Sequence, residues 1–220
     1  MTSGTGAGQR AKRVLDVALC LLAVPLAVPV MVLLAVAVRA GGPGPVLYRA
    51  RRVGRDMVPF DLFKFRTMTP GAAGPGVTSA ADPRITSVGR WLRASKLDEL
   101  PQLVNVLRGE MSIVGPRPEA PRFVAYYTGA QRAVLAVRPG MTSLAFLHFG
   151  HEQAFIERAG PRDVESFYLT DLLPAKLAIE LRYIREWTLL GDLRIIARTV
   201  LGLFSRTGGD HEKQRSDGIR

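Results

Sequence analysis

The sequence predicts a mostly α-helical protein with a small β-hairpin, an α+β fold attached to a membrane by its N-terminal segment. Three observations support this prediction: an uncharged apolar run near the N-terminus, two β-capable runs within 46–66, and apolar residues at helical spacing toward the C-terminus. A chain of 220 residues can bury a core without disulfides or a bound metal.

The apolar run 17–38 contains only apolar residues and proline. As a helix it would be about 33 Å long, which is about the thickness of the hydrocarbon core of a bilayer. A signal peptide has a shorter apolar region, and a core helix of a soluble protein carries polar interruptions. The run therefore predicts insertion into a membrane.

The flanks and the prolines of this run bear on its topology. Basic side chains lie on both sides of it: Arg10, Lys12 and Arg13 before, and Arg39, Arg49, Arg51, Arg52 and Arg55 after. Because basic flanks favour the cytoplasmic side, a simple spanning helix has no clear orientation here. Pro25 and Pro29 lie near the middle, where proline bends a helix. Together these features favour a re-entrant, proline-kinked helix that enters and leaves one leaflet, with a kinked spanning helix as the alternative.

Composition divides the chain into four parts. They are residues 1–9, which we expect to be disordered, a membrane segment 10–40, a folded domain 41–204, and a polar tail 205–220 that we also expect to be disordered. In the folded domain we expect a hairpin from Val46–Arg52 and Val58–Arg66, a loop over 69–81, and helices near 86–94, 101–108, 126–137 and 174–204. The amphipathic segment 174–204 fits the core, the membrane surface or a subunit contact, so a homo-oligomer stays open.

The charge balance indicates the kind of partner. The chain has 30 Lys and Arg against 19 Asp and Glu, a formal net charge of +11, which predicts a nucleic acid, anionic membrane lipids or a phosphorylated substrate. It contains no recognised nucleic-acid-binding module, so we expect no nucleic acid partner. A single cysteine, Cys20, excludes an internal disulfide and a cysteine-rich zinc site, and only three histidines argue against a histidine-built metal site.

The densest group of charges lies in the segment 93–102, where Asp98 and Glu99 sit between basic residues and Pro101. Proline is favoured in the first turn of a helix, so a helix should begin at or just before Pro101 and end at Gly109. Acidic residues at a helix N-terminus stabilise it by about 0.3–1 kcal/mol, and Ser95 with Asp98 has the spacing of a capping box. Taken alone, helix capping is the simplest interpretation of the acidic pair.

Four separated cations favour a chemical role instead. A strand over 63–68 would place Lys64 and Arg66 on one face, and two rigid turns, GPRP and VRPG, present Arg117 and Arg138. Stiffly held cations that converge suit a diphosphate. A carboxylate among such cations can bind Mg²⁺ or attack phosphorus, and the residues alone leave both open.

In their order along the chain and in their residues, these segments resemble the bacterial sugar transferases, the small monotopic polyprenyl-phosphate glycosyl-1-phosphate transferases. The resemblance covers about residues 10–202, nearly the whole chain. Its most specific part is the run LDELPQL followed by GEMSIVGPRPE. Other matching pieces are KRVLDVALCLLAVPLAVPV, GGPGPVLYRARRVGRDMVPFDLFKFRTM, VRPGMT and LLPAKLAIELRYIREWTLLGDLRIIART.

The resemblance implies a re-entrant membrane helix broken at a central proline, here Pro25, with further amphipathic helices at the membrane interface. It places the protein on the cytoplasmic face of the bacterial inner membrane. It also implies transfer of a sugar-1-phosphate from a UDP-sugar to a polyprenol phosphate, such as undecaprenyl phosphate, with release of UMP. That reaction is the first membrane step of polysaccharide or glycoconjugate assembly.

Site residues follow from the same resemblance. Asp98 matches the nucleophilic aspartate of the family, which would form a covalent aspartyl-phosphosugar intermediate and bind Mg²⁺. Glu99 matches its partner glutamate, a candidate to take a proton from the acceptor. The candidate substrate-binding cations are Lys64, Arg66 and Arg93 for phosphates, and Arg117 and Arg138 for the nucleotide portion.

The segment after the second turn departs from the family pattern. Much of the family reads RPGITGWAQ, whereas this chain has MTSLAF after Gly140, followed by His151 and Glu152. The identity of the sugar therefore stays open. The alternatives to a transferase are a membrane-anchored polyanion binder, a non-catalytic scaffold, and a phosphohydrolase that uses the same carboxylate with water. The acidic pair argues against the first two, and the membrane segment favours a lipid acceptor over water.

Overall fold

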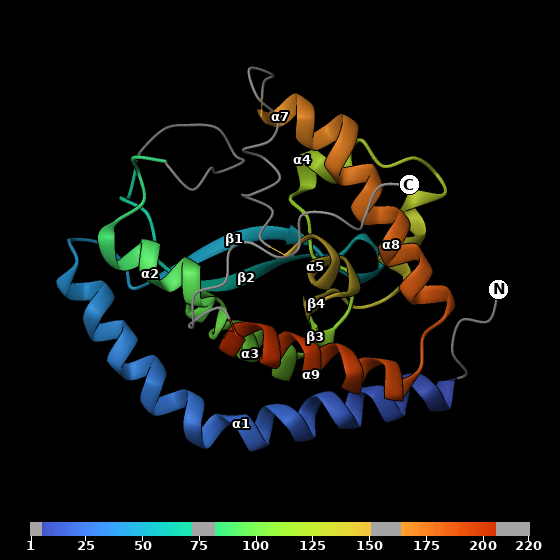
Figure 1. The fold of residues 1–220 in the computed structure, drawn as a ribbon, viewed down its shortest axis with the longest axis horizontal. Helices are drawn as coiled ribbons and strands as arrows, with labels where there is room; N and C mark the ends of the chain where they lie inside the picture. The colour runs from blue at the N-terminus through green and yellow to red at the C-terminus, as the bar shows by residue number, and fades with distance from the viewer. Residues whose placement is uncertain (1–5, 72–81, 151–163, 206–220) are drawn as a thin grey trace.

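The computed structural model describes residues 6–71, 82–150 and 164–205 of the chain. Its helices and strands are α1 (Gly6–Ala40), β1 (Leu47–Val53), β2 (Pro59–Phe65), α2 (Ser87–Ser95), α3 (Gln102–Arg108), β3 (Ser112–Val114), α4 (Pro121–Val124), β4 (Gly140–Thr142), α5 (Leu144–Phe149), α7 (Val164–Phe167), α8 (Leu173–Arg185) and α9 (Leu189–Ser205) (Figure 1). Short 3-10 turns cover Arg55–Met57, Leu97–Glu99 and Gln131–Ala136. The predicted mostly helical fold with a small sheet is confirmed.

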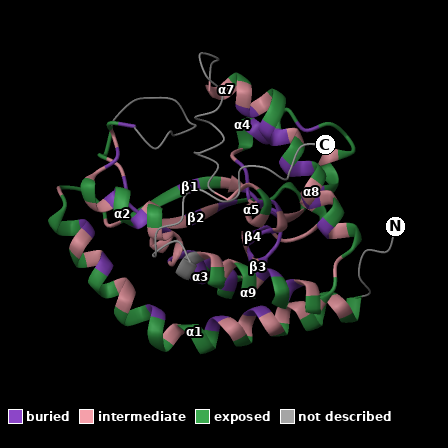
Figure 2. Ribbon diagram, viewed as in Figure 1, coloured by how far each residue is buried: buried purple, intermediate pink, exposed green. Residues whose placement is uncertain are grey.

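Helix α1 begins at Gly6, earlier than expected, and continues through Pro25 and Pro29 without being divided in two. Its ribbon extends along one side of the molecule and curves around it (Figure 1). The helix is long and apolar enough to cross a membrane by length and composition, and only 17% of its most apolar window is buried. Its buried residues are Asp16, Cys20, Ala27, Leu34 and Val38. They are spaced by four or seven, so they form one stripe facing the domain, and much of the rest of the helix is coloured as exposed or intermediate (Figure 2). Large apolar residues such as Leu22 and Leu26 are among the exposed ones.

Charged side chains attach the N-terminal part of α1 to the folded domain. The Lys12 ammonium lies 2.5 Å from Asp192 of α9, and Asp192 is 1% exposed. Arg13 donates to backbone carbonyls at the C-terminal end of α3 at 2.6 and 2.9 Å. The buried Asp16 carboxylate accepts a hydrogen bond from the Ser112 hydroxyl of β3 at 3.0 Å. Three neighbouring polar residues of one helix therefore contact three different elements of the domain.

The C-terminal end of α1 is attached to the same domain by Arg66. This buried guanidinium, directly after β2, donates to the carbonyls of Val38 and Gly42 at 2.8 Å each, and to that of Pro43. The last carbonyls of a helix have no partner within the helix, so a cation that hydrogen-bonds them stabilises the end of α1.

The predicted hairpin is confirmed. Strands β1 and β2 pair antiparallel, with Leu47 opposite Phe65. The completely buried Asn105 of α3 fixes this hairpin to the helix, since its side chain accepts from the Phe63 N–H at 3.0 Å and donates to the Asp61 carbonyl at 2.8 Å. These two bonds set the position of α3 relative to the strand that carries Lys64.

A second, parallel pair of strands was not predicted. Strands β3 and β4 pair Ser112 with Gly140 and Val114 with Thr142. A Cβ atom on Gly140 would lie 2.1 Å from the nitrogen of Gly115, which directly follows β3, so this close approach requires glycine. Because Gly115 opens the GPRP turn and Gly140 closes the VRPG turn, this pairing places the two proline-rich turns side by side.

Two predicted helices differ from the structure. The segment 126–137 contains only the short 3-10 turn Gln131–Ala136, because Gln131 accepts from the Thr128 N–H at 2.9 Å and stabilises a local turn. The segment 174–204 divides into α8 and α9 because Thr188 begins a new helix, its hydroxyl accepting from the Gly191 N–H at 2.9 Å. The predicted loop 69–81 and tail 205–220 lie almost wholly outside the described residues, as do residues 1–5.

Candidate active site

The acidic pair lies in a sharp connection between α2 and α3. Helix α2 ends at Lys96, which adopts a left-handed conformation with φ 61°, and the 3-10 turn Leu97–Glu99 follows. Helix α3 begins after Pro101 without a side-chain cap, and Gly109 ends it, as predicted. The Ser95 hydroxyl instead donates back to the Trp91 carbonyl of α2 at 2.9 Å. The capping interpretation of the acidic pair is therefore wrong, and these carboxylates have other partners.

Glu99 lies between two cations. One of its oxygens accepts from Lys64 of β2 at 3.0 Å and from Arg117 of the GPRP turn at 2.8 Å. Burial raises the pKa of Glu99, but the charges of Arg117, Lys64 and Lys96 outweigh it and hold that pKa well below its ordinary value. Glu99 is thus a charged group that holds two cations together.

Asp98 has the opposite environment. It is 6% exposed, and its Oδ1 has no hydrogen-bond partner among the described residues. Burial raises the pKa of Asp98, and the neighbouring Glu99 adds to this effect, while Lys64 and Lys96 oppose it. A buried carboxylate oxygen without a hydrogen-bond partner destabilises the fold, and a bound ligand that contacts it would offset this cost. Asp98 Oδ1 is therefore the oxygen of this pair that is placed to bind a cation or to attack an electrophile.

The structure brings three of the predicted cations to this pair. Lys64 and Arg117 bind Glu99 directly. Arg93 of α2 is oriented by Thr67, whose hydroxyl accepts from Arg93 Nε at 2.8 Å. Burial lowers the pKa of Arg93 and the charge of Asp98 raises it, which places this guanidinium within the field of the carboxylate.

The other two predicted cations bind helix ends. Arg66 binds the C-terminal end of α1, and Arg138 Nε donates to the Gly109 carbonyl at the end of α3 at 2.8 Å. Among the described residues, neither forms a hydrogen bond or ion pair with Asp98 or Glu99. Lys96, by contrast, was not predicted as a site residue, yet its ammonium lies in the field of both carboxylates. Its position two residues before Asp98 was a usable signal, but its left-handed backbone cannot be read from sequence.

A metal site can be tested against the chemistry of this cluster. No group of three or more His, Cys, Asp or Glu side chains able to hold a metal occurs within 6–71, 82–150 and 164–205. Mg²⁺ commonly binds through one or two carboxylates plus substrate phosphates and water. The unpartnered Oδ1 of Asp98 fits such a shared site, whereas Glu99 is occupied by its two cations.

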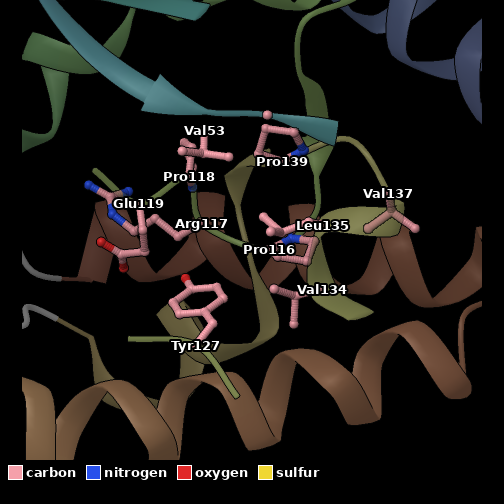
Figure 3. A pocket seen from close by; sticks show the side chains of 11 residues that line it. Val53, Pro116, Arg117, Pro118, Glu119, Tyr127, Val134, Leu135, Val137 and Pro139 are labelled. Carbon is pink, nitrogen blue, oxygen red and sulfur yellow. The ribbon is translucent and has the colours of Figure 1, made fainter. Parts of the chain in front are cut away.

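A small cavity lies beside the two proline-rich turns (Figure 3). Its walls are Val53 and Gly54 of the hairpin, the stretch Pro116–Glu119, Tyr127, and the group Val134, Leu135, Val137 and Pro139. The Tyr127 ring lies across the cavity from Val53 and Pro118 (Figure 3). Arg117 thus lines an apolar cavity and also binds Glu99, which connects the cavity to the acidic pair.

A carboxylate pair beside several cations is the arrangement expected of an enzyme that acts on phosphorylated substrates, and the same chain has one helix long and apolar enough to cross a membrane. Comparison with known families gives a more specific answer. The family model described as "Bacterial sugar transferase" matches residues 7–206, so the chain belongs to the bacterial sugar transferase family. The resemblance stated from the motifs is confirmed.

Curated relatives agree with this membership. The chain is 42% identical over 199 residues to a UDP-glucose:undecaprenyl-phosphate glucose-1-phosphate transferase of Caulobacter vibrioides, covering 88% of this chain and 70% of the relative. It is 36% identical to an enzyme of the same name in Escherichia coli, covering 89% of this chain and 40% of the relative. It is 35% identical to an exopolysaccharide production protein of Sinorhizobium fredii, covering 88% and 85%. The prediction that the chain is a phosphoglycosyl transferase is confirmed by these relatives.

Proposed function

We propose that the protein transfers a sugar-1-phosphate from a UDP-sugar to undecaprenyl phosphate and releases UMP, as the first membrane step in assembling a polysaccharide. The observation that carries this proposal is the buried Asp98, with an unpartnered Oδ1, inside a cluster of cations. Two of the relatives are named for UDP-glucose, so UDP-glucose is the first donor to test.

In the proposed first step, an Asp98 oxygen attacks the sugar-proximal phosphorus of the donor. The bond from that phosphorus to the bridging oxygen breaks, and UMP leaves with the electron pair. Lys64, Arg93 and Arg117 would stabilise the charge that develops on the diphosphate oxygens. Arg117, at the edge of the cavity beside the proline-rich turns, would bind the nucleotide portion. Asp98 would hold Mg²⁺, which would supply positive charge to neutralise the donor phosphates.

In the second step, an oxygen of undecaprenyl phosphate attacks the same phosphorus and releases the Asp98 carboxylate. A phosphate monoester has a second pKa near 6, so the acceptor is largely deprotonated at neutral pH and needs no general base. Because Glu99 has a strongly lowered pKa, it would be a weak base. We therefore assign Glu99 the role of holding Lys64 and Arg117 in place.

We also propose that α1 is re-entrant and that the domain lies on the cytoplasmic face of the inner membrane. This topology is supported by the attachment of both ends of the apolar run to one folded domain, through Lys12 and Asp16 at one end and Arg66 at the other. A helix that crossed the bilayer would separate those ends. Cysteines added before Lys12 and after Gly44, in a Cys20→Ser background, should both be labelled from the cytoplasmic side; labelling from opposite sides would refute the topology.

The reaction is tested by UMP release from purified protein with Mg²⁺, undecaprenyl phosphate and a panel of UDP-sugars. We expect one donor to give UMP with full dependence on the lipid, and Asp98→Asn to reduce the rate by about four orders of magnitude or more. Chelation of Mg²⁺ should abolish turnover, and added Mg²⁺ should restore it. UMP release without lipid dependence would instead indicate hydrolysis, and no release from folded protein with any donor would refute the proposal.

A further inference from the structure

Lys96 differs from the other cations around the acidic pair. Lys64 and Arg117 are bound to Glu99, and Arg93 Nε is bound to Thr67. In the described part of the chain, no hydrogen bond or ion pair involves the Lys96 ammonium. The side chain is half-buried, and burial lowers its pKa while Glu99 raises it. A cation partly removed from water without a polar partner has three donors available for a ligand.

Two features hold this ammonium in place. The backbone of Lys96 is left-handed, a conformation that costs a residue other than glycine about 1–2 kcal/mol and is seldom adopted by lysine. The conformation closes α2 and starts the turn that carries Asp98. The Lys96 Nζ then lies 5.3 Å from the centre of the Phe146 ring, within the range of a cation–π interaction.

Phe146 is itself held by its helix. Its N–H donates to the Ser143 hydroxyl at 2.9 Å, which begins α5. Phe146 belongs to the segment MTSLAF, in which this chain departs from the common family pattern. The ring that contacts Lys96 therefore comes from the segment that leads from β4 into α5.

We propose that Lys96, held by Phe146, is a phosphate-binding residue of the active site whose ammonium donates hydrogen bonds to a phosphoryl oxygen of a bound substrate. Among the described residues, the Lys96 ammonium is a hydrogen-bond donor without an acceptor, and Asp98 Oδ1 is an acceptor without a donor. A phosphoryl group satisfies both, since its oxygens accept from the ammonium and its phosphorus faces the carboxylate. The inference rests on the proposed transferase function and adds a residue to it. The phosphoryl group belongs either to the donor diphosphate or to the lipid phosphate.

Kinetics of Lys96→Met, Lys96→Arg and Phe146→Leu test the proposal and separate the two sources. A charged hydrogen bond is worth about 1.5–3 kcal/mol, so Lys96→Met should lower kcat/KM by about 10–150-fold. Lys96→Arg should recover most of the activity, and Phe146→Leu should lose about two- to fivefold. If Lys96 binds the donor, KM for the UDP-sugar rises. If it binds the acceptor, KM for undecaprenyl phosphate rises while that for the UDP-sugar is unchanged.

Arg122→Met is the matched control, because Arg122 also lies over an aromatic ring, that of Phe123 at 4.5 Å, but belongs to α4 and pairs with Glu165. It should keep wild-type kinetics. A direct measurement makes the test independent of turnover: calorimetric binding of inorganic diphosphate should weaken at least tenfold in Lys96→Met and less in Lys96→Arg, with unchanged melting temperature. Equal diphosphate affinity in wild type and Lys96→Met, or kcat/KM values within twofold for both substrates, would overturn the proposal. A wild type that binds diphosphate through Lys96 but releases no UMP would refute the transferase function alone.

Discussion

Glu180 of α8 offers a direct test of how burial controls ionisation in this fold. The residue is 3% exposed, and neither carboxylate oxygen has a hydrogen-bond partner among the described residues. The groups that face it are the Ser143 hydroxyl, the Lys176 ammonium, and the backbone N–H groups of Ala145 and Arg117. Burial outweighs these groups and raises the pKa of Glu180 from 4.5 to about 7. The perturbation is Glu180→Gln, which keeps the shape and removes the titration.

The magnitude follows from linkage. A rise of about 2.5 pKa units corresponds to about 3 kcal/mol, because one unit is worth about 1.4 kcal/mol. Between pH 4.5 and 7 the folded state keeps a proton that the unfolded state has lost, so the free energy of unfolding falls as pH rises. The full stabilisation is present below pH 4.5 and is lost above pH 7. Glutamine is neutral at every pH, so the free energy of unfolding of the variant does not fall in this way as pH rises.

The assay is thermal unfolding of both proteins in the same detergent from pH 4 to 8.5. One kcal/mol shifts the melting temperature of a protein of this size by about 2–4 °C, so the variant should gain about 6–12 °C relative to wild type across that range. Burying the glutamine amide changes the free energy of unfolding by the same amount at every pH, so it does not affect the pH dependence of the difference. Glu186→Gln, an exposed residue at the end of the same helix, controls for the loss of one carboxylate. A difference between Glu180→Gln and wild type that stays constant with pH, or that falls as pH rises, would refute the reasoning.

Three further predictions concern the attachments of α1 and the acidic pair. Asp192→Asn breaks the buried pair with Lys12 and should destabilise the protein by about 3 kcal/mol, seen as a melting temperature lower by about 6–12 °C; an unchanged value would contradict it. Arg66→Met removes three hydrogen bonds from the end of α1 and should cost about 3 kcal/mol of unfolding free energy in denaturant titration, with Arg66→Lys recovering part of it. Arg117→Met should raise the pKa of Glu99, which a carboxyl NMR titration of wild type and variant would measure, and an unchanged Glu99 pKa would argue against the ion pair.

Local features of the fold were predictable because they depend on local signals. The hairpin 46–66 has alternating β-capable residues around a glycine turn, and α3 has proline at its start and glycine at its end. The pair β3 and β4 was not predictable, because each strand is three residues long and their pairing depends on the close approach of Gly115 and Gly140. Strands this short carry no periodicity of their own.

The candidate site shows the same division. Asp98, Glu99 and Arg93 lie on one continuous segment, so their proximity follows from the sequence. Arg66 is different: strand alternation predicts that it shares a face with Lys64, but it lies just beyond β2, where the last turn of α1 and the residues after it offer three carbonyls. A guanidinium that finds backbone acceptors at a helix end is satisfied there, and only the tertiary structure shows which helix end that is.

The basic residues before the apolar run also have tertiary partners that the sequence alone does not show. The rule that relates basic residues to the cytoplasmic side concerns charges that interact with the membrane and the insertion machinery. In the folded protein Lys12 is bound to the buried Asp192, and Arg13 is bound to the end of α3, so these two charges act inside the molecule. Arg13 also joins α1 to α3, whose opposite end follows the Asp98 turn. The position of α1 therefore helps to fix α3, the helix that directly follows the turn carrying the acidic pair.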